Sequence, residues 1–310
     1  MTHLTSLCPK GQSIKWVDSN QPIEIQRDQL DGILSVIVSP SYYPVELARM
    51  TKSVKLVQTL SAGTDQIDKV TLGEMGIMVS NNGGGNAISV AELTVGLIIS
   101  TYRKLQLQFN SVQSGNWAGD IRSKWGHQSL EIAGKTIGII GLGRIGHRIA
   151  KRLNGWECNL VYSDIVDMDK QFERQLGVSR LPQNELLETA DIVTLHVPLN
   201  KSTYHMISDP EFTIMKPTAL LINASRGPVV DEKALARAIS EQQIAGAALD
   251  VTEEEPTSPD NPLFQFENVL ITPHLAANTV ESGERSRGFA VANATRVASG
   301  EEPESVVIPD

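Results

Sequence analysis

The chain has 310 residues, of which 41% are hydrophobic and 20% are charged, and its formal net charge is −9 at pH 7. These values indicate a soluble globular protein that can build substantial cores and has about the right length for two domains. The acidic balance argues against nucleic acid or an anionic membrane as a partner, so an anionic ligand would need a local group of cations.

The amino-terminal segment predicts a cytoplasmic protein. Its first residues, MTHLTSLCPKGQS, lack the basic and then apolar pattern of a secretion signal. The most apolar helical stretch, LTVGLIIS at 93–100, is far shorter than the roughly 20 residues that span a bilayer. The two cysteines, Cys8 and Cys158, cannot form a disulfide framework. We therefore expect a cytoplasmic protein without a membrane partner.

The first hundred residues predict a parallel series of strands and helices. Short apolar runs at 35–39, 55–60 and 77–80 are typical of buried strands, and the helical segments PVELARMTK and TLGEMG lie between them. A long helical pattern then covers residues 86–117. Ser89, which is followed three residues later by a glutamate, predicts a capping box near its start.

A second series of strands begins at TIGIIG and alternates with helical patterns. Because each strand is followed by a crossover helix, we expect a parallel, doubly wound sheet. The tail from Leu275 is helical and amphipathic until Gly300, and we expect it to pack back on the first series because it is too short for a domain. The predicted strands of the second series lie at 136–141, 159–164, 191–198, 219–225, 245–251 and 268–274.

The first strand of this series runs into GLGRIG, which predicts a dinucleotide-binding turn. Gly141 allows the turn, Gly143 lets backbone amides approach a pyrophosphate, and Gly146 lets the next helix pack on the sheet. The following strand ends in Asp164, where an acid binds ribose hydroxyls and repels a 2′-phosphate, so NAD is favoured over NADP. Alternatively, Asp164 only caps its strand. The predicted residues are Gly141, Gly143, Arg144, Ile145, Gly146 and Asp164.

These patterns predict an α/β protein with two domains. Residues 102–275 would form a doubly wound (Rossmann) domain that binds NAD. Residues 1–101 and 276–310 would form a smaller, flavodoxin-like α/β domain, discontinuous in sequence, that binds the substrate.

Charged side chains follow several strands of the second series. Arg226 comes just after 219–225, Asp250 and Glu255 follow the next strand, and His274 ends VLITPH. Ligands of doubly wound sheets bind beyond the carboxyl ends of the strands, so these residues can converge. A guanidinium binds a carboxylate through two parallel bonds, and a histidine bonded to a carboxylate can donate a proton near neutral pH. The set therefore predicts hydride exchange between a nicotinamide and a small 2-oxo or 2-hydroxy acid, with no metal.

Several segments resemble the D-isomer-specific 2-hydroxyacid dehydrogenase family. LINASRGPVVDEKAL, GAALDVTEEEP and NVLITPHLAANT are similar to its three signature segments, and GKTIGIIGLGRIGHRIAKRL, TLHVPLNKST and LSAGTDQID match it as well. The resemblance covers roughly residues 54–280. It implies a homodimer and the catalytic set Arg226, Glu255 and His274, in which Glu255 is selected because it directly precedes a proline.

The resemblance also implies contacts with substrate and cofactor. The backbone of the LSAGTD loop would hold the substrate carboxylate, and Asp250 would approach the nicotinamide amide. The implied substrate-binding residues are Ser61, Ala62, Gly63, Arg226 and His274. The implied cofactor-lining residues of this group are Val197, Pro198, Thr203, Asn223, Ala224, Ser225 and Asp250.

Other interpretations stay open. A non-catalytic, NAD-sensing corepressor is one, and a methyltransferase would also use a glycine loop. His196 ends another strand and is the rival to His274 as proton donor. We expect Glu253 and Glu254 to form a solvated acidic turn, and Trp117 to lie at a dimer contact as in relatives. The substrate could be glyoxylate, hydroxypyruvate, pyruvate, a branched oxo acid, or a phosphorylated or sulfonated one.

Overall fold

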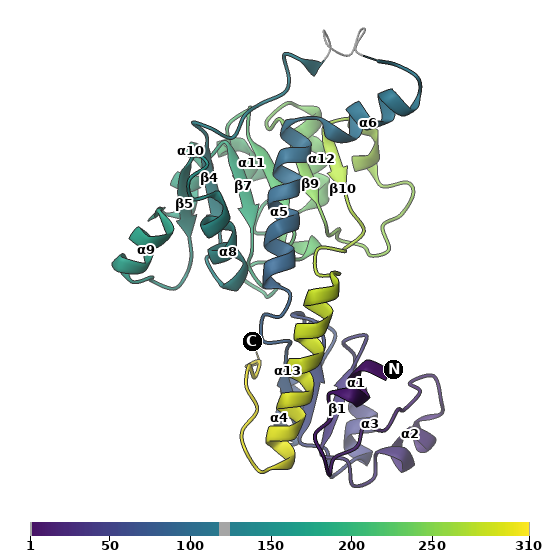
Figure 1. Cartoon of the computed structure of the whole chain (residues 1–310). Helices are drawn as coiled ribbons and strands as arrows, with labels where there is room; N and C mark the ends of the chain where they lie inside the picture. Colours follow the sequence, from purple (N-terminus) through teal and green to yellow (C-terminus); the bar gives the residue numbers. More distant parts are fainter. Residues whose placement is uncertain (1, 118–124, 310) are drawn as a thin grey trace. The chain divides into compact units, whose positions relative to one another are not determined.

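The computed structural model describes residues 2–117 and 125–309, and the chain divides into two compact units (Figure 1). The first unit consists of Met1–Asn86 and Asn278–Asp310, and the second consists of Ala87–Ala277.

The boundary between the units differs from the one expected after residue 101. Helix α5 (Ala87–Tyr102) belongs to the second unit. Its residues Ala91 and Ile98 are completely buried in the same core as Ile137 of that unit. A helix so apolar must be covered by a large core, and here that core belongs to the larger sheet.

The first unit contains a parallel sheet in which the described strands follow the order β1-β2-β3. All three lie within the predicted apolar runs, and β2 is buried along its whole length. The carboxyl-terminal helix α13 packs against β1 and β2, as predicted for the tail. The elements are α1 (Thr2–Ser6), α2 (Ile23–Leu30), β1 (Ser35–Val38), α3 (Val45–Met50), β2 (Leu56–Thr59), α4 (Lys69–Glu74), β3 (Met78–Ser80) and α13 (Val280–Ala298).

The second unit contains seven parallel strands among its described residues, in the order β10-β9-β8-β7-β4-β5-β6. The chain order reverses around β4, between β5 and β7, and doubly wound sheets bind ligands at such a switch point. The sequence did not predict β6, because only the first of its three residues is apolar and buried. The strands are β4 (Thr136–Ile140), β5 (Asn159–Ser163), β6 (Val178–Arg180), β7 (Ile192–Leu195), β8 (Leu220–Asn223), β9 (Gly246–Leu249) and β10 (Val269–Ile271).

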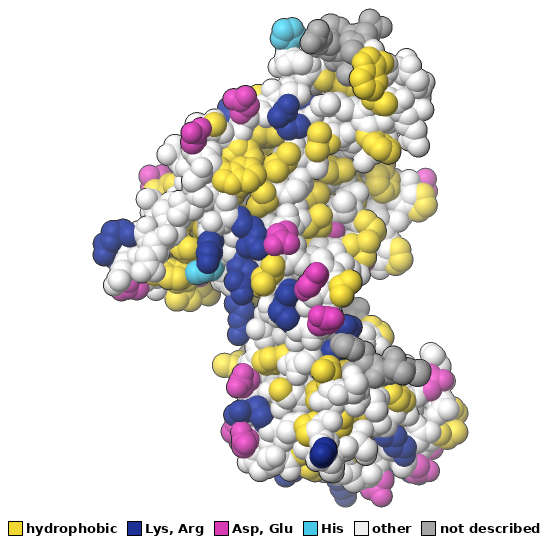
Figure 2. All heavy atoms as spheres, viewed as in Figure 1, with side chains coloured by type: hydrophobic (Ala, Val, Ile, Leu, Met, Phe, Trp, Pro, Cys, Tyr) yellow, Lys and Arg dark blue, Asp and Glu magenta, His cyan; other side chains and the backbone are white. Residues whose placement is uncertain are grey.

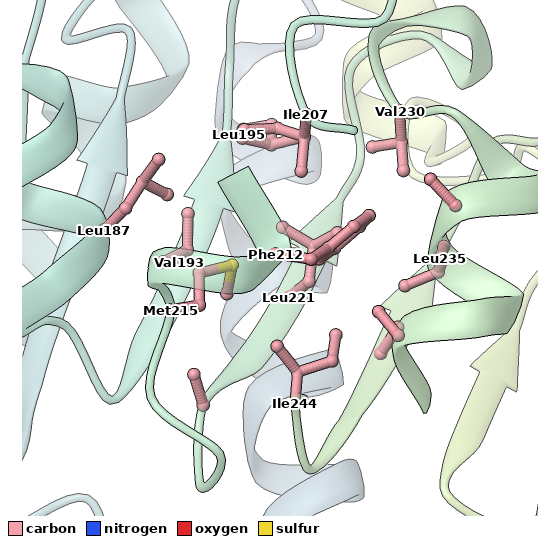
Figure 3. Close-up of a cluster of buried hydrophobic side chains, with 14 of the residues drawn as sticks. Leu187, Val193, Leu195, Ile207, Phe212, Met215, Leu221, Val230, Leu235 and Ile244 are labelled. Carbon is pink, nitrogen blue, oxygen red and sulfur yellow. The ribbon is translucent and has the colours of Figure 1, made fainter. Parts of the chain in front are cut away.

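Helices cover both faces of this sheet, which explains why β7, β8 and β9 are buried along their whole length. On one face, Phe212 lies among side chains from β7, β8 and α12 (Figure 3). On the other face, α5 and α8 pack against each other and cover Ile137 and Ile139. The remaining helices of the described residues are α6 (Leu105–Gln113), α8 (Arg144–Leu153), α9 (Lys170–Leu176), α10 (Gln183–Thr189), α11 (Asp209–Ile214), η1 (Gly227–Val229), α12 (Glu232–Ser240) and η2 (Pro262–Gln265).

The long helix predicted over 86–117 is two helices. It breaks at Lys104, whose φ of 54° is left-handed, and α6 begins at the next residue. Ser89 lies inside α5 and is buried, so the prediction that it caps the helix is wrong. Among the described residues, no helix combines the length and apolarity needed to cross a membrane.

Strand register brings the carboxyl ends of the central strands to one edge. Ile140 of β4 lies opposite Ser163 of β5 and Leu195 of β7. Asn223 of β8 lies between Leu195 and Leu249 of β9. The residues that directly follow these ends therefore share this edge of the sheet, and they are Gly141, Asp164, His196, Ala224 and Asp250.

Candidate functional site

The glycine turn after β4 is shaped by close backbone approaches. Gly141 has a φ of +92°, and a Cβ there would lie 2.6 Å from the carbonyl oxygen of His196. A Cβ on Gly146 would lie 2.2 Å from the carbonyl oxygen of Gly141, so only glycine lets α8 begin so close to the turn. Around Gly143, by contrast, no described atom lies within 4 Å of a Cβ position.

The start of α8 fits a dinucleotide pyrophosphate. Gly143 is the N-cap of this helix and has no side chain that could cap the N–H groups of the first turn. These donors and the positive end of the helix dipole suit an anion. Arg144 and Ile145 are the first two residues of this helix.

Asp164 ties the end of β5 to the glycine turn. Its carboxylate accepts hydrogen bonds from the N–H of Leu142 at 2.7 Å and from the N–H of Val166 at 2.9 Å. The acid therefore stands directly beside the phosphate loop. This is the place where a doubly wound sheet binds the adenosine ribose.

Arg226 lies at the carboxyl end of β8 and is half-buried. Its Nη1 donates to the carbonyl oxygen of Ser225 at 2.7 Å, and its own carbonyl accepts from Asn223 Nδ2 at 2.9 Å. Asn223 also accepts from the N–H and the hydroxyl of Ser225. The sharp turn after the strand is therefore bonded internally, and this fixes the backbone that carries the guanidinium.

Gly227 joins the loop of Arg226 to the loop that leads to Glu255. A Cβ on Gly227 would lie 1.8 Å from the carbonyl oxygen of Thr252 and 2.6 Å from the N–H nitrogen of Glu253. No other residue type would allow the two backbones to approach so closely. The amino-acid sequence alone did not indicate this requirement.

His274 and Glu255 form a pair. His274 Nδ1 lies 2.7 Å from Glu255 Oε2, and the two side chains are 44% and 38% exposed. The bond to Glu255 uses one ring nitrogen and leaves Nε2 for another partner. His274 follows β10, whose last residue Ile271 is in register with Leu249, so the pair stands at the carboxyl edge of the sheet.

Asp250 holds the loop that carries His274. It is 1% exposed, and its carboxylate accepts from Thr272 Oγ1 at 2.7 Å and from the N–H groups of Leu275 and Ala276 at 3.1 and 2.8 Å. Its carbonyl oxygen accepts from the N–H of His274 at 2.7 Å. Sequence reasoning selected Asp250 only as a cofactor neighbour and missed this positioning role.

His196 is poorly suited to donate a proton. Its Nε2 lies 2.7 Å from Thr194 Oγ1, and its buried Nδ1 has no hydrogen-bond partner among the described residues. Burial lowers the pKa of His196 to about 3, so the ring is neutral near pH 7. His274, which is bonded to a carboxylate, is the better candidate of the two.

The other cofactor residues predicted from the sequence surround the same edge. Thr203 Oγ1 donates to the carbonyl oxygen of Pro198 at 2.6 Å, which closes the turn after Val197. Ala224 packs with Ile145 in a small apolar cluster. These residues are half-buried or buried, except for Pro198, which is exposed.

The other residues predicted to hold the substrate carboxylate, beside Arg226, belong to the first unit. They follow β2, and the hydroxyl of Ser61 donates to the carbonyl oxygen of Gly63 at 2.8 Å, while Ala62 lies between them. Ser61 Oγ also lies 2.6 Å from Ser41 Oγ. The loop is thus internally bonded, at the carboxyl end of its strand.

Glu253 and Glu254 are exposed, as expected for an acidic turn, but Glu253 also has hydrogen-bond partners. Its Oε1 accepts from the N–H of Glu232 at 2.7 Å, and its own N–H donates to Glu232 Oε1 at 2.5 Å. His205 Nε2 lies 3.2 Å from the same carboxylate. Glu253 therefore ties the loop of Glu255 to the start of α12.

Comparison with known proteins places these features in context. The family model described as "D-isomer specific 2-hydroxyacid dehydrogenase, NAD binding domain" matches residues 95–276. A glyoxylate reductase of Thermofilum pendens is 37% identical to this chain over 96% of its length and 86% of the relative. A D-3-phosphoglycerate dehydrogenase of Archaeoglobus fulgidus is 40% identical over 80% of this chain and 46% of the relative.

Solved structures show the same fold. The apo form of D-mandelate dehydrogenase from Rhodotorula graminis superimposes with a TM-score of 0.85 at 26% sequence identity. The match covers 94% of this chain and 89% of that one.

Proposed function

Because the chain belongs to the D-isomer-specific 2-hydroxyacid dehydrogenase family, we propose that it interconverts a 2-oxo acid and a D-2-hydroxy acid with Arg226, Glu255 and His274 at the reacting centre. NAD is its cofactor. The proposal depends above all on the 2.7 Å contact between His274 Nδ1 and Glu255 Oε2 at the edge that also carries the glycine turn.

His274 is the acid and base of the proposed reaction. The Glu255 carboxylate at Nδ1 fixes the tautomer and the orientation of the ring. In the reducing direction, His274 gives the proton on Nε2 to the carbonyl oxygen of the substrate. In the reverse direction, Nε2 takes the proton from the hydroxyl group. Asp250 positions His274 through the backbone bonds described above.

Arg226 binds the substrate. Its planar guanidinium can bind a carboxylate through two parallel hydrogen bonds and can polarise the adjacent carbonyl. The main chain of Ser61, Ala62 and Gly63 is also proposed to bind the substrate carboxylate.

The proposed cofactor site consists of residues at the carboxyl ends of the parallel strands. NAD, when bound, supplies or accepts the hydride. The glycine turn and the start of α8 hold the pyrophosphate, and Asp164 binds the ribose hydroxyls. The residues proposed to line the rest of the dinucleotide are Val197, Pro198, Thr203, Asn223, Ala224, Ser225 and Asp250.

The names of relatives indicate which substrates to test first. Glyoxylate reductases match nearly the whole chain, so we rank glyoxylate first, followed by hydroxypyruvate and larger 2-oxo acids. The test is a panel of these acids with NADH and with NADPH, in which loss of absorbance of the reduced nicotinamide reports turnover. Binding of NADH without turnover of any of these acids would favour a non-catalytic, NAD-sensing protein.

We also propose a cytoplasmic homodimer. α6 exposes three apolar side chains, Leu105, Phe109 and Val112, and Trp117 beyond it is 79% exposed. Large apolar side chains gathered in this way typically mark a protein interface. A second copy of the chain is the partner that the family resemblance implies.

A further inference from the structure

An arginine from the edge strand β6 reaches the loop after β5. Arg180 Nη2 donates to the carbonyl oxygen of Asp164 at 2.7 Å, and Nη1 forms an ion pair with the carboxylate of Asp167. In the sheet, Arg180 is in register with Tyr162 of β5. A cation therefore stands beside the residue proposed to bind the adenosine ribose, although none follows Asp164 directly in the sequence.

The loop between Asp164 and Asp167 presents its side chains to solvent. Ile165 is 100% exposed and Val166 is 56% exposed. The carboxylate of Asp164 faces the glycine turn, whereas the carboxylate of Asp167 pairs with Arg180. The loop and Arg180 together carry two negative charges and one positive charge, and each carboxylate acts on a different neighbour.

We propose that Asp167 is a determinant of cofactor choice, because it pairs with a guanidinium that could otherwise bind the 2′-phosphate of NADP. NADP differs from NAD only by this phosphate, which is dianionic or nearly so near neutral pH. Arginine is the side chain best suited to phosphate, and its ion pair with Asp167 competes for the same donors. The inference rests on the proposed assignment of Asp164 to the adenosine ribose.

The charges near the Asp164–Asp167 loop make the relative affinity for NADP and NAD sensitive to the charge of Asp167. α8 carries Arg144, Arg148, Lys151 and Arg152, and Lys and Arg side chains gather over this helix in Figure 2. Asp164 bonds to the glycine turn that leads into this helix. Removing the charge of Asp167 shifts the local potential toward an anion, whereas Asp164 still repels it.

The experiment compares dissociation constants for NADPH and NADH, followed by the fluorescence of the reduced nicotinamide without substrate. Asp167→Asn keeps the size of an 82% exposed side chain and removes its charge. We expect the ratio of the NADPH constant to the NADH constant to fall by about fivefold at low salt, and the effect to shrink at high salt. Adding Arg180→Gln to Asp167→Asn should restore the original ratio.

Glu188→Gln is the matched control. Glu188 is exposed on α10 of the same unit, so this substitution removes the same charge away from the loop, and the ratio should change less than about twofold. An unchanged ratio in Asp167→Asn, or a gain that persists after Arg180→Gln, would overturn the inference and leave the proposed function intact. Failure of the wild-type protein to bind either dinucleotide would overturn both.

Discussion

At the scale of single residues, the backbone conformation of His274 is the most informative feature of the site. Its φ of +51° is left-handed, a conformation that costs a residue other than glycine on the order of 1 kcal/mol. The hydrogen bonds from the N–H groups of His274, Leu275 and Ala276 to Asp250 hold it there. Strain that neighbouring bonds maintain is typical of functional sites, so the buried acid and the exposed histidine form one unit.

Replacing Glu255 with glutamine removes the charge beside His274 and keeps the size of the side chain. A carboxylate holds one ring tautomer and orientation, whereas the glutamine amide can also turn its donor group toward Nδ1, so we expect kcat/KM for 2-oxo acid reduction to fall by about tenfold or more. The measurement is kcat/KM with NADH at one fixed pH. Glu254→Gln, at the exposed neighbour, is the control and should keep the wild-type value. Equal kcat/KM values for all three proteins would mean that Glu255 does not act on His274.

Gly227→Ala tests the close approach of the two catalytic loops. The new Cβ would lie 1.8 Å from a backbone oxygen of Thr252, so the loops must separate. We expect a loss of about 1–3 kcal/mol in the free energy of unfolding, together with lower kcat/KM. Denaturant unfolding is the measurement. In Gly96→Ala, where no described atom lies within 4 Å, stability should be unchanged or higher by up to about 1 kcal/mol. Equal stabilities of the two variants would contradict the account.

At the scale of secondary structure, the patterns that the sequence shows clearly are those set by burial. The strands that lie inside the sheet are continuous apolar runs, and the sequence predicts them because helices cover both of their faces. β6 is an edge strand with two exposed residues and leaves no such pattern. The break at Lys104 also leaves none, because it depends on a backbone dihedral angle and not on apolar periodicity.

The residues of the site also divide into those that the sequence predicts and those that it does not. Signature segments predict Arg226, Glu255 and His274, because their chemistry requires particular residue types after particular strands. The hydrogen bonds of Asp250 and the hydrogen bond from Arg180 to Asp164 depend on how separate loops fold against each other. Such contacts appear only once the strand order and register are known.

Asp191 links the amino-terminal end of β7 to Thr136 of β4 and to Lys216. Burial alone would raise its pKa, but the N–H of Thr136 and the Lys216 ammonium, at 2.8 and 2.9 Å, outweigh burial and hold the pKa below its ordinary value. The resulting stabilisation is present above the ordinary pKa of about 4 and is lost as the pH falls through the folded value.

We therefore expect Asp191→Asn to cost about 1–3 kcal/mol of unfolding free energy at neutral pH, with the difference from wild type shrinking below about pH 4. Urea denaturation at several pH values measures it. Asp260→Asn, at an exposed position, should cost less than about 0.5 kcal/mol. A deficit for Asp191→Asn that does not depend on pH would show that lost packing, and not the charge, is responsible.

At the scale of the whole molecule, the net charge of −9 repels the anionic ligands that the protein is proposed to bind. The positive groups are local: the start of α8, Arg226 and the cations of α8. Composition predicts that an anionic ligand needs such a local arrangement. The division into units, by contrast, depends on which core covers α5, and the pattern within that helix does not reveal it.

The proposed dimer contact can be tested at the same scale. Phe109→Glu places a charge on α6 where the side chain is 64% exposed. We expect this variant to sediment as a monomer if the wild-type protein is a dimer, since a buried unpaired charge costs several kcal/mol. Val70→Glu, at a 52% exposed position of α4 in the first unit, should leave the dimer unchanged. A dimer that persists in Phe109→Glu would place the interface elsewhere.

The turnover number of His274→Ala, measured with NADH and the best 2-oxo acid of the panel, tests the central claim most directly. The account predicts a decrease of about 10²–10⁴-fold, the usual contribution of a positioned acid–base group, while fluorescence titration still detects NADH binding. Turnover close to that of the wild-type protein, in a variant that binds NADH, would contradict the assignment of His274 as the proton donor.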